Sequence, residues 1–173
     1  CQPDLVLNVG VCGGYACRGA EIGQVYVADA VYFHDRRVPD FPGLEGWHEY
    51  FKKNFLAFDA RPAARALGLP TGSVTTGDSF AASEDDAARI EESGALLKEM
   101  EAGAYAWTAA LNRTPIVLLK AVTDIVDQEH PNEAEFLENL HRASEHLRDR
   151  TMALIDLASS GPLDRIGVEV SID

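Results

Sequence analysis

The sequence predicts an α/β fold in which helices cover both faces of a central sheet. Short apolar runs rich in Val, Ile and Leu alternate along the chain with segments of helical periodicity, which is the pattern of such folds. The chain has 173 residues, of which 46% are hydrophobic and 25% charged, and this suits a single domain over residues 1–173 with a sizeable core. Its longest apolar runs are far shorter than the roughly 18 residues of a membrane span.

The predicted strands are apolar segments bounded by Pro, Gly or Asp. They cover residues 5–9, 23–35, 71–80, 94–100 and 114–124, the third of them ending in a turn. The first is a continuous apolar run, so we expect it to be buried on both faces. The segment after it, GVCGGYACRG, has four glycines in ten residues, which indicates positive φ angles or a close approach of the backbone to another group.

The predicted helices carry recognisable start and stop signals. They cover residues 58–67, which Gly68 would end, and residues 83–92, which Ser83 and the acids after it would begin. The Ala-rich segment 101–112 and the amphipathic segment 132–159 complete the set. Pro and Gly recur between residues 36 and 47, so we expect a long loop there.

The charge, the cysteines and the chain start narrow the class of protein. With 15 Lys plus Arg against 28 Asp plus Glu, the net charge is −13, which argues against nucleic acid as a partner. Cys1, Cys12 and Cys17 have neither disulfide nor zinc-site spacing, which favours an intracellular, cytoplasmic location. Only four residues, without an initiator Met, precede the first apolar run, so we expect the native N-terminus to lie upstream.

Candidate functional residues follow the predicted strands, because open α/β sheets bind ligands at the carboxyl ends of their strands. Asp124 ends the most apolar strand, where partial desolvation would let it keep a proton near neutrality and act as a general acid. The alternative is that Asp124 caps the following turn, with Asp127 as a solvated neighbour. Thr123 would either orient the Asp124 carboxyl group or serve only as a strand residue.

Glu99 and Glu101 alternate about Met100, which would place both carboxylates on one face, where they could bind a diol. The alternative is that Glu101 is an acidic first-turn residue of the following helix. Phe80 follows a Gly-Asp turn and could stack on a planar ligand, although most such aromatic residues belong to the core. Lys120 lies inside an apolar strand, so it needs a charged partner or a path to solvent.

Two further patterns carry weaker signals. Gly10, Gly13 and Gly14 could form an anion-binding nest, but they match neither the dinucleotide-binding pattern nor the Walker pattern. His34 and Asp35 could form a catalytic pair, but their place in an HDRR sequence beside a Pro-rich loop favours a turn or interface role.

Taken in order, several segments resemble the nucleoside phosphorylase superfamily, and within it the plant-type nucleosidases of 5′-methylthioadenosine and S-adenosylhomocysteine. These segments are PDLVLNVGVCGGY, VYVADAVYFHDRRVP, TTGDSF, KEMEAGA, LLKAVTDIVD and EFLENL. The resemblance implies a three-layer α/β/α sandwich with a mixed central sheet that lacks one or more N-terminal strands here. It implies hydrolysis of the adenine–ribose bond of 5′-methylthioadenosine, leaves S-adenosylhomocysteine open as a second substrate, and implies no metal or cofactor.

The resemblance also assigns roles to individual residues. Asp124 is similar to the general acid at adenine N7, and Glu101 and Met100 to the ribose contacts, with Glu99 beside them. The remaining positions are Phe80 as the residue that stacks on adenine, Ala81 at the base edge, Cys12 and Gly13 under the purine, Val38 in the pocket wall, and Thr123 next to the acid. An acid at the leaving group and carboxylate contacts to the sugar are what an oxocarbenium-like transition state requires.

Departures from the family pattern leave alternatives open. Val11 stands where family hydrolases have a hydroxyl residue, and the superfamily's first strand supplies a Glu from upstream of Cys1. We therefore expect the isolated chain to be poorly active, and near-normal turnover of 5′-methylthioadenosine would contradict this. Asn8 replaces the phosphate-binding Arg of hexameric phosphorylases, which favours water as the nucleophile.

The alternative functions are a purine nucleoside phosphorylase and a degenerate storage-type member of the fold. The resemblance further implies a homodimer in which the loop after His34 and Asp35 reaches the partner subunit. The aromatic residues Phe41, Trp47 and Tyr50 of that loop would then be buried in the interface.

Overall fold

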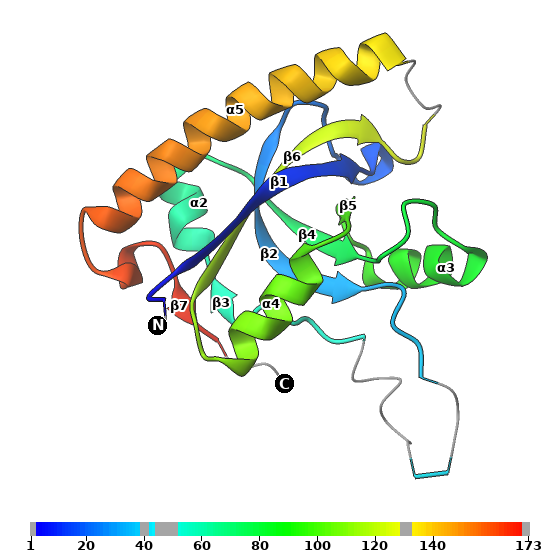
Figure 1. Cartoon of the computed structure of the whole chain (residues 1–173), viewed down its shortest axis with the longest axis horizontal. Helices are drawn as coiled ribbons and strands as arrows, with labels where there is room; N and C mark the ends of the chain where they lie inside the picture. Colours follow the sequence, from blue (N-terminus) through cyan, green and yellow to red (C-terminus); the bar gives the residue numbers. More distant parts are fainter. Residues whose placement is uncertain (1–2, 39–41, 44–51, 129–132, 171–173) are drawn as a thin grey trace.

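The computed structural model describes residues 3–38, 42–43, 52–128 and 133–170 (Figure 1). Its main sheet consists of β1 (Val6–Gly14), β2 (Val25–Phe33), β4 (Thr71–Thr76), β5 (Leu97–Glu99) and β6 (Ile116–Ile125). The strand order is β1-β5-β4-β2-β6, and the sheet closes into a barrel because β6 also pairs with β1. Parallel pairs such as β1–β6 occur beside antiparallel pairs such as β2–β6, so the sheet is mixed, as predicted.

Helices cover both faces of this sheet (Figure 1). They are α2 (Arg61–Leu67), α3 (Glu84–Ser93), α4 (Ala102–Leu111) and α5 (Glu133–Ser159), with short 3-10 helices η1 (Ala16–Arg18) and η2 (Leu163–Arg165). One apolar cluster lies between the sheet and α4, and a second lies between the sheet and the α2 and α5 helices. The predicted α/β fold is thus confirmed, whereas its closure into a ring was not expected.

The helix boundaries follow the local signals in the sequence. Gly68 ends α2 with a φ of +62°, as predicted, while the first two residues of the expected helix form β3 (Phe58–Asp59) instead. Ser83 caps α3 through a reciprocal capping box with Asp86. β3 pairs with β7 (Val168–Glu169), a strand that was not predicted.

β1 differs most from the prediction. It continues through the glycine-rich segment to Gly14, and none of its glycines has a positive φ. Close packing explains them: a Cβ on Gly14 would lie 2.5 Å from the Cβ of Ala20, and one on Gly13 would lie 2.6 Å from Val126 Cγ2. The expectation of an anion nest was therefore wrong.

The prediction that β1 is buried on both faces was also wrong. Val9 and Val11 are 37% and 36% exposed. β1 pairs with β6 along its whole length but with β5 only at Gly13 and Gly14. Among the described residues, the second edge of β1 from Val6 to Cys12 thus has no strand beside it.

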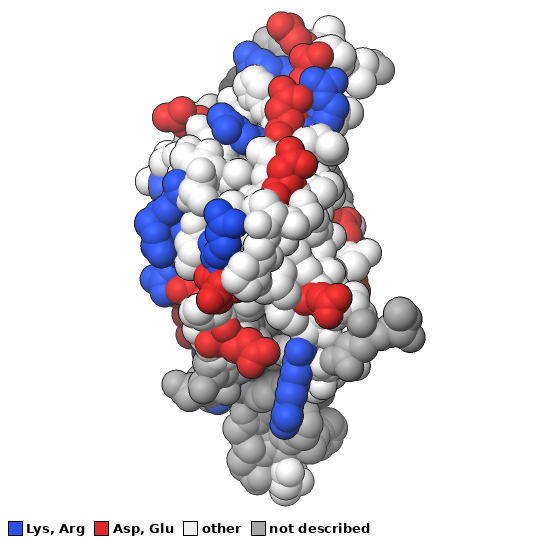
Figure 2. Space-filling view, turned by 90° about the vertical axis from the view of Figure 1, so that its left-hand side faces the viewer, with Lys and Arg blue, Asp and Glu red and all other residues white. Residues whose placement is uncertain are grey.

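Charged side chains of both signs lie together on one face of the molecule. On the face shown in Figure 2, acidic and basic side chains are interspersed between uncharged ones. Within the described ranges, no helix has the length and apolarity needed to cross a membrane.

Candidate active site

A cleft of about 430 Å³ lies beside the ends of β1 and β6 and the turn after β5. Its lining residues are Gly10, Val11, Cys12, Gly13, Phe80, Lys98, Glu99, Met100, Glu101, Thr123, Asp124, Val126 and Phe136. Its volume is in the range of small-molecule sites. All the predicted site residues except Val38 and Ala81 line it, although the roles predicted for them remain predictions.

Asp124 is half-buried in this cleft, and its carboxyl group has defined neighbours. Thr123 Oγ1 lies 2.9 Å from Asp124 Oδ1, within hydrogen-bonding distance. On the other side Gly13 leaves room for the carboxyl group, because a Cβ on Gly13 would lie 3.3 Å from Asp124 Oδ2. The Asp124 side chain is therefore oriented by Thr123 and by the space that the missing side chain of Gly13 leaves beside β1.

Asp127, expected to be only a solvated neighbour, has a structural role. Its carboxylate oxygens accept hydrogen bonds from the backbone N–H groups of Ala16 and Cys17, at 2.8 and 2.9 Å. These bonds, with that from the Cys17 side chain foremost, lower the pKa of Asp127 to about 2. The carboxylate that fixes the chain beyond β6 is thus Asp127, which leaves Asp124 facing the cleft.

The two glutamates of the KEME sequence have different surroundings. The Glu99 side chain is 2% exposed, and its Oε2 accepts hydrogen bonds from Lys120 Nζ at 2.7 Å and from the N–H of Ala102 at 2.8 Å. Thr76 Oγ1 donates to its other oxygen. Burial alone would raise the pKa of Glu99, but Lys120 and these hydrogen bonds hold it below its ordinary value.

Both carboxylate oxygens of Glu99 are thus occupied by contacts within the protein. The prediction that Lys120 needs a charged partner is confirmed. Glu101, by contrast, keeps 59% of its side chain exposed at the cleft. It is also the N-cap residue of α4, but its side chain makes no capping hydrogen bond and it precedes the first turn, so the first-turn alternative was wrong. Its contact with a diol stays a prediction. Burial and the neighbouring Glu99 raise the pKa of Glu101.

Phe80 is the more exposed of the two phenylalanines that line the cleft, at 78% against 37% for Phe136. The Phe80 backbone is fixed by Lys98, whose Nζ donates a hydrogen bond to the Phe80 carbonyl oxygen at 2.7 Å. The same ammonium group lies 5.8 Å from the centre of the Phe80 ring. Burial lowers the pKa of Lys98.

Sequence reasoning did not single out Lys98, although it breaks an apolar strand just as Lys120 does. It also missed Val126 and Phe136, which line the cleft from the turn after β6 and from α5 without a distinguishing local pattern. Cys12 is 4% exposed, and burial raises the pKa of its thiol, so it contributes an apolar wall. The predicted interface residues Phe41, Trp47 and Tyr50 lie outside the described residues.

Comparison with known proteins identifies the family of this chain. The model of the phosphorylase superfamily matches residues 1–156. The chain belongs to the phosphorylase superfamily.

Two plant relatives are similar over most of this chain. A 5′-methylthioadenosine nucleosidase of Arabidopsis thaliana is 41% identical over 139 residues, which are 80% of this chain and 51% of the relative. A 5′-methylthioadenosine/S-adenosylhomocysteine nucleosidase of the same plant is 39% identical over 158 residues, or 91% and 61% of the two chains. The solved structure of Arabidopsis thaliana 5′-methylthioadenosine nucleosidase superposes with a TM-score of 0.85 at 37% identity, covering 94% of this chain and 65% of that one. This superfamily member thus spans half to two thirds of the length of these relatives.

Proposed function

We propose that the protein hydrolyses the N-glycosidic bond of 5′-methylthioadenosine and releases adenine. The proposal rests on one observation: Asp124, Phe80 and Glu101 line the same cleft. These are a carboxylic acid, an exposed aromatic ring and an exposed carboxylate, which suit the leaving group, the purine face and the sugar hydroxyls. The names of the relatives give the same substrate class, with S-adenosylhomocysteine as a second substrate.

The proposed reaction needs a proton at the departing base. As the C1′–N9 bond breaks, Asp124 gives its proton to adenine N7, so adenine leaves neutral. Water bonds to C1′, and the proton it loses restores the acid form of Asp124 in the next cycle. Thr123, at hydrogen-bonding distance from Oδ1, keeps the carboxyl group directed at the base.

The sugar side of the proposed site depends on Glu101 and the ion pair beneath it. The Glu101 carboxylate would accept hydrogen bonds from the ribose hydroxyls, and its negative charge would favour a positively charged ribosyl transition state. Lys120 Nζ lies 3.9 Å from Glu101 Oε2. Because Glu99 holds Lys120 at 2.7 Å, most of the lysine charge is already balanced and Glu101 keeps its acceptor capacity.

Water is the nucleophile that the residues favour over phosphate. Asn8 is buried, and its Oδ1 has no hydrogen-bond partner among the described residues. A neutral amide at that position offers a phosphate dianion no counter-charge. A purine nucleoside phosphorylase is therefore only the second candidate function, and an assay with and without phosphate distinguishes it from the hydrolase.

The test is adenine release by the protein that carries this chain, with and without phosphate. We expect release that does not depend on phosphate, and a loss of about 10²- to 10⁴-fold in kcat in Asp124→Asn while adenine binding is retained. Asp149→Asn, an exposed residue on α5, is the matched control. Phosphate-dependent formation of ribose 1-phosphate would select the phosphorylase instead.

A degenerate, storage-type protein would neither turn over nor bind the substrate. A rise in melting temperature with adenine or an adenosine analogue therefore separates a working site from a vestigial one.

A homodimer and a cytoplasmic location complete the proposal. The free thiols of Cys12 and Cys17 support a reducing compartment. Sedimentation measurements on the protein test the homodimer.

A further inference from the structure

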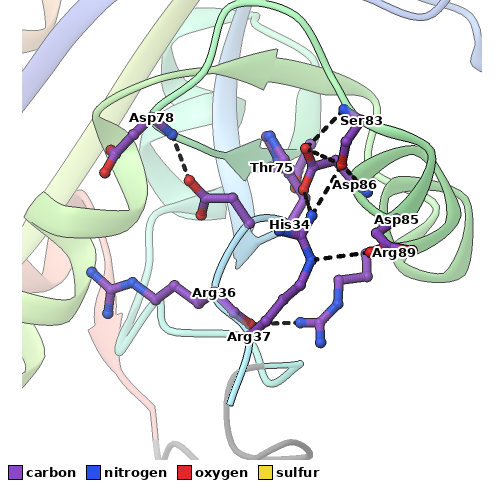
Figure 3. Close-up of polar contacts among 10 residues, drawn as sticks. His34, Arg36, Arg37, Thr75, Asp78, Ser83, Asp85, Asp86 and Arg89 are labelled. Carbon is purple, nitrogen blue, oxygen red and sulfur yellow. Dashed lines mark hydrogen bonds and ion pairs between the residues drawn. The ribbon is translucent and has the colours of Figure 1, made fainter. Parts of the chain in front are cut away.

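The Phe80 loop, residues 77–83, is exposed from Asp78 to Ser83 and buries no large side chain of its own. A segment with so little apolar burial depends on polar contacts for its conformation. Lys98 holds the Phe80 carbonyl group in the middle of the loop. The contacts at its two ends come from the HDRR segment, residues 34–37, which follows β2 and lies beside both ends (Figure 3).

The first end of the Phe80 loop is held by His34 and Asp35. Asp35 Oδ2 accepts a hydrogen bond from the N–H of Asp78 at 2.6 Å. The His34 ring is 2% exposed, and its Nδ1 lies 3.0 Å from Thr75 Oγ1. Gly77 packs directly on this ring, since a Cβ there would lie 2.2 Å from His34 Nε2.

The second end is held through Arg37. Its guanidinium group contacts Asp86 in an ion pair and lies 3.2 Å from Ser83 Oγ (Figure 3). Asp86 is 6% exposed and accepts hydrogen bonds from the N–H and the hydroxyl of Ser83, at 2.9 and 2.7 Å. Arg37, Asp86 and Ser83 therefore fix the point where the loop enters α3.

The HDRR segment is itself anchored to the core. The guanidinium carbon of Arg36 lies 3.6 Å from the centre of the Phe33 ring and 4.3 Å from that of Trp107. Arg89 Nη1 donates a hydrogen bond to the Arg36 carbonyl oxygen at 2.7 Å. The contacts at both ends of the Phe80 loop thus lead back to β2, α3 and α4.

We propose that Asp35 and Arg37 are positioning residues, which hold the Phe80 ring where it can cover the purine and thereby set substrate affinity. This rests on the proposed function insofar as the ligand is an adenine nucleoside. Neither residue lines the cleft, so their effect on a ligand passes through the loop.

The test is a double-mutant cycle between Arg37→Met and Phe80→Ala. Arg37→Met alone is expected to raise the KM for 5′-methylthioadenosine, and the Kd of adenine, about 5- to 10-fold, with kcat changed less than about twofold. In the Phe80→Ala background the same change should shift affinity less than about twofold, because the ring to be positioned is gone. Arg37→Lys, which keeps the charge, should restore part of the affinity.

Arg61→Met provides the matched control. Arg61, whose side chain is 59% exposed, forms an ion pair with Asp59 at 2.8 Å. Neither residue lines the cleft, so the control should leave KM unchanged. An equal affinity loss from Arg37→Met with and without Phe80 would overturn the proposal, since it would place the effect elsewhere.

A ligand-free measurement separates this proposal from the proposed function. Amide hydrogen exchange at residues 78–82 should speed up at least about tenfold in Asp35→Ala and in Arg37→Met but not in Arg61→Met. If the native protein binds no adenine compound, the proposed function fails while exchange still tests the positioning role. Unchanged amide hydrogen exchange in both variants would contradict the positioning role of Asp35 and Arg37.

Discussion

Lys120 and Glu99 form a pair of opposite charges beside the cleft, which Glu99 lines, and their side chains are only 1% and 2% exposed. Removing charges from water costs several kcal/mol per ion, so each of these groups depends on the other. The hydrogen bonds from Thr76, Ala102 and Glu101 to the Glu99 carboxylate complete the compensation. The same carboxylate also anchors the start of α4, which carries Glu101.

Glu99→Gln should therefore destabilise the fold strongly. It leaves the buried Lys120 ammonium group with only the more distant Glu101 carboxylate, at 3.9 Å, and we expect the free energy of unfolding to fall by about 3 to 5 kcal/mol. Urea denaturation measures this, with Asp149→Asn in an exposed pair as a control that costs less than about 1 kcal/mol. Glu99→Gln combined with Lys120→Met should be more stable than Glu99→Gln alone. A double variant that is less stable would contradict the account of the pair.

His34 gives the fold a pH dependence of defined sign. Burial lowers the pKa of His34 below its ordinary 6.5, so as pH falls the unfolded chain takes up this proton before the folded one. Stability present above about pH 6.5 is then lost toward pH 5. In His34→Gln the free energy of unfolding should fall less steeply between pH 7 and pH 5. His141→Gln, whose side chain is 79% exposed in the native chain, should keep the native slope.

For single residues, residue type and position in a strand predicted that Asp124 lies at the cleft and that Lys120 has a charged partner. They could not distinguish Glu99 from Glu101, because the difference arises where β5 ends and α4 begins. One residue lies at the end of the strand above Lys120, and the other turns outward as a helix cap. Lys98 was missed because its hydrogen-bond partner, the Phe80 carbonyl group, is supplied by a distant loop.

Among the elements, β1 shows what a glycine-rich strand can do. Gly13 and Gly14 let the backbone lie against Val126 and Ala20. Strand and helix positions elsewhere followed from periodicity and capping, as Ser83 and Gly68 illustrate. The extension of β1 could not be predicted, since four glycines in ten residues indicate a turn more readily than a strand.

Gly14→Ala should lower the free energy of unfolding by about 1 to 3 kcal/mol, because its Cβ would overlap that of Ala20 at 2.5 Å. Thermal or urea denaturation measures the loss. Gly10→Ala is the control in the same strand, since its Cβ would meet only Lys120 Nζ at an ordinary 3.4 Å. Equal effects of the two substitutions would show that strand propensity, rather than close packing, explains these glycines.

For the molecule as a whole, the second edge of β1 from Val6 to Cys12 has consequences for association. An exposed strand edge offers backbone N–H and C=O groups to another chain. We expect the 173-residue chain to associate more as its concentration rises, as measured by sedimentation velocity. Val9→Lys places a charge on this edge, at a residue 37% exposed, and should shift the distribution toward the monomer. Association that Val9→Lys does not change would assign it to another surface.

The alternation of strands and helices was sufficient to predict the layers, but ring closure was not predictable. It depends on β1 turning far enough to meet β5 at Gly13 and Gly14, a long-range pairing with no local sequence signal.

That meeting point has a mechanical consequence. Gly13 belongs both to the short seam that closes the sheet and to the floor of the cleft. A ligand bound in the cleft would therefore contact the β1–β5 pairing directly. Ligand binding should then stabilise the closed arrangement of all five strands, including strands that the ligand does not contact.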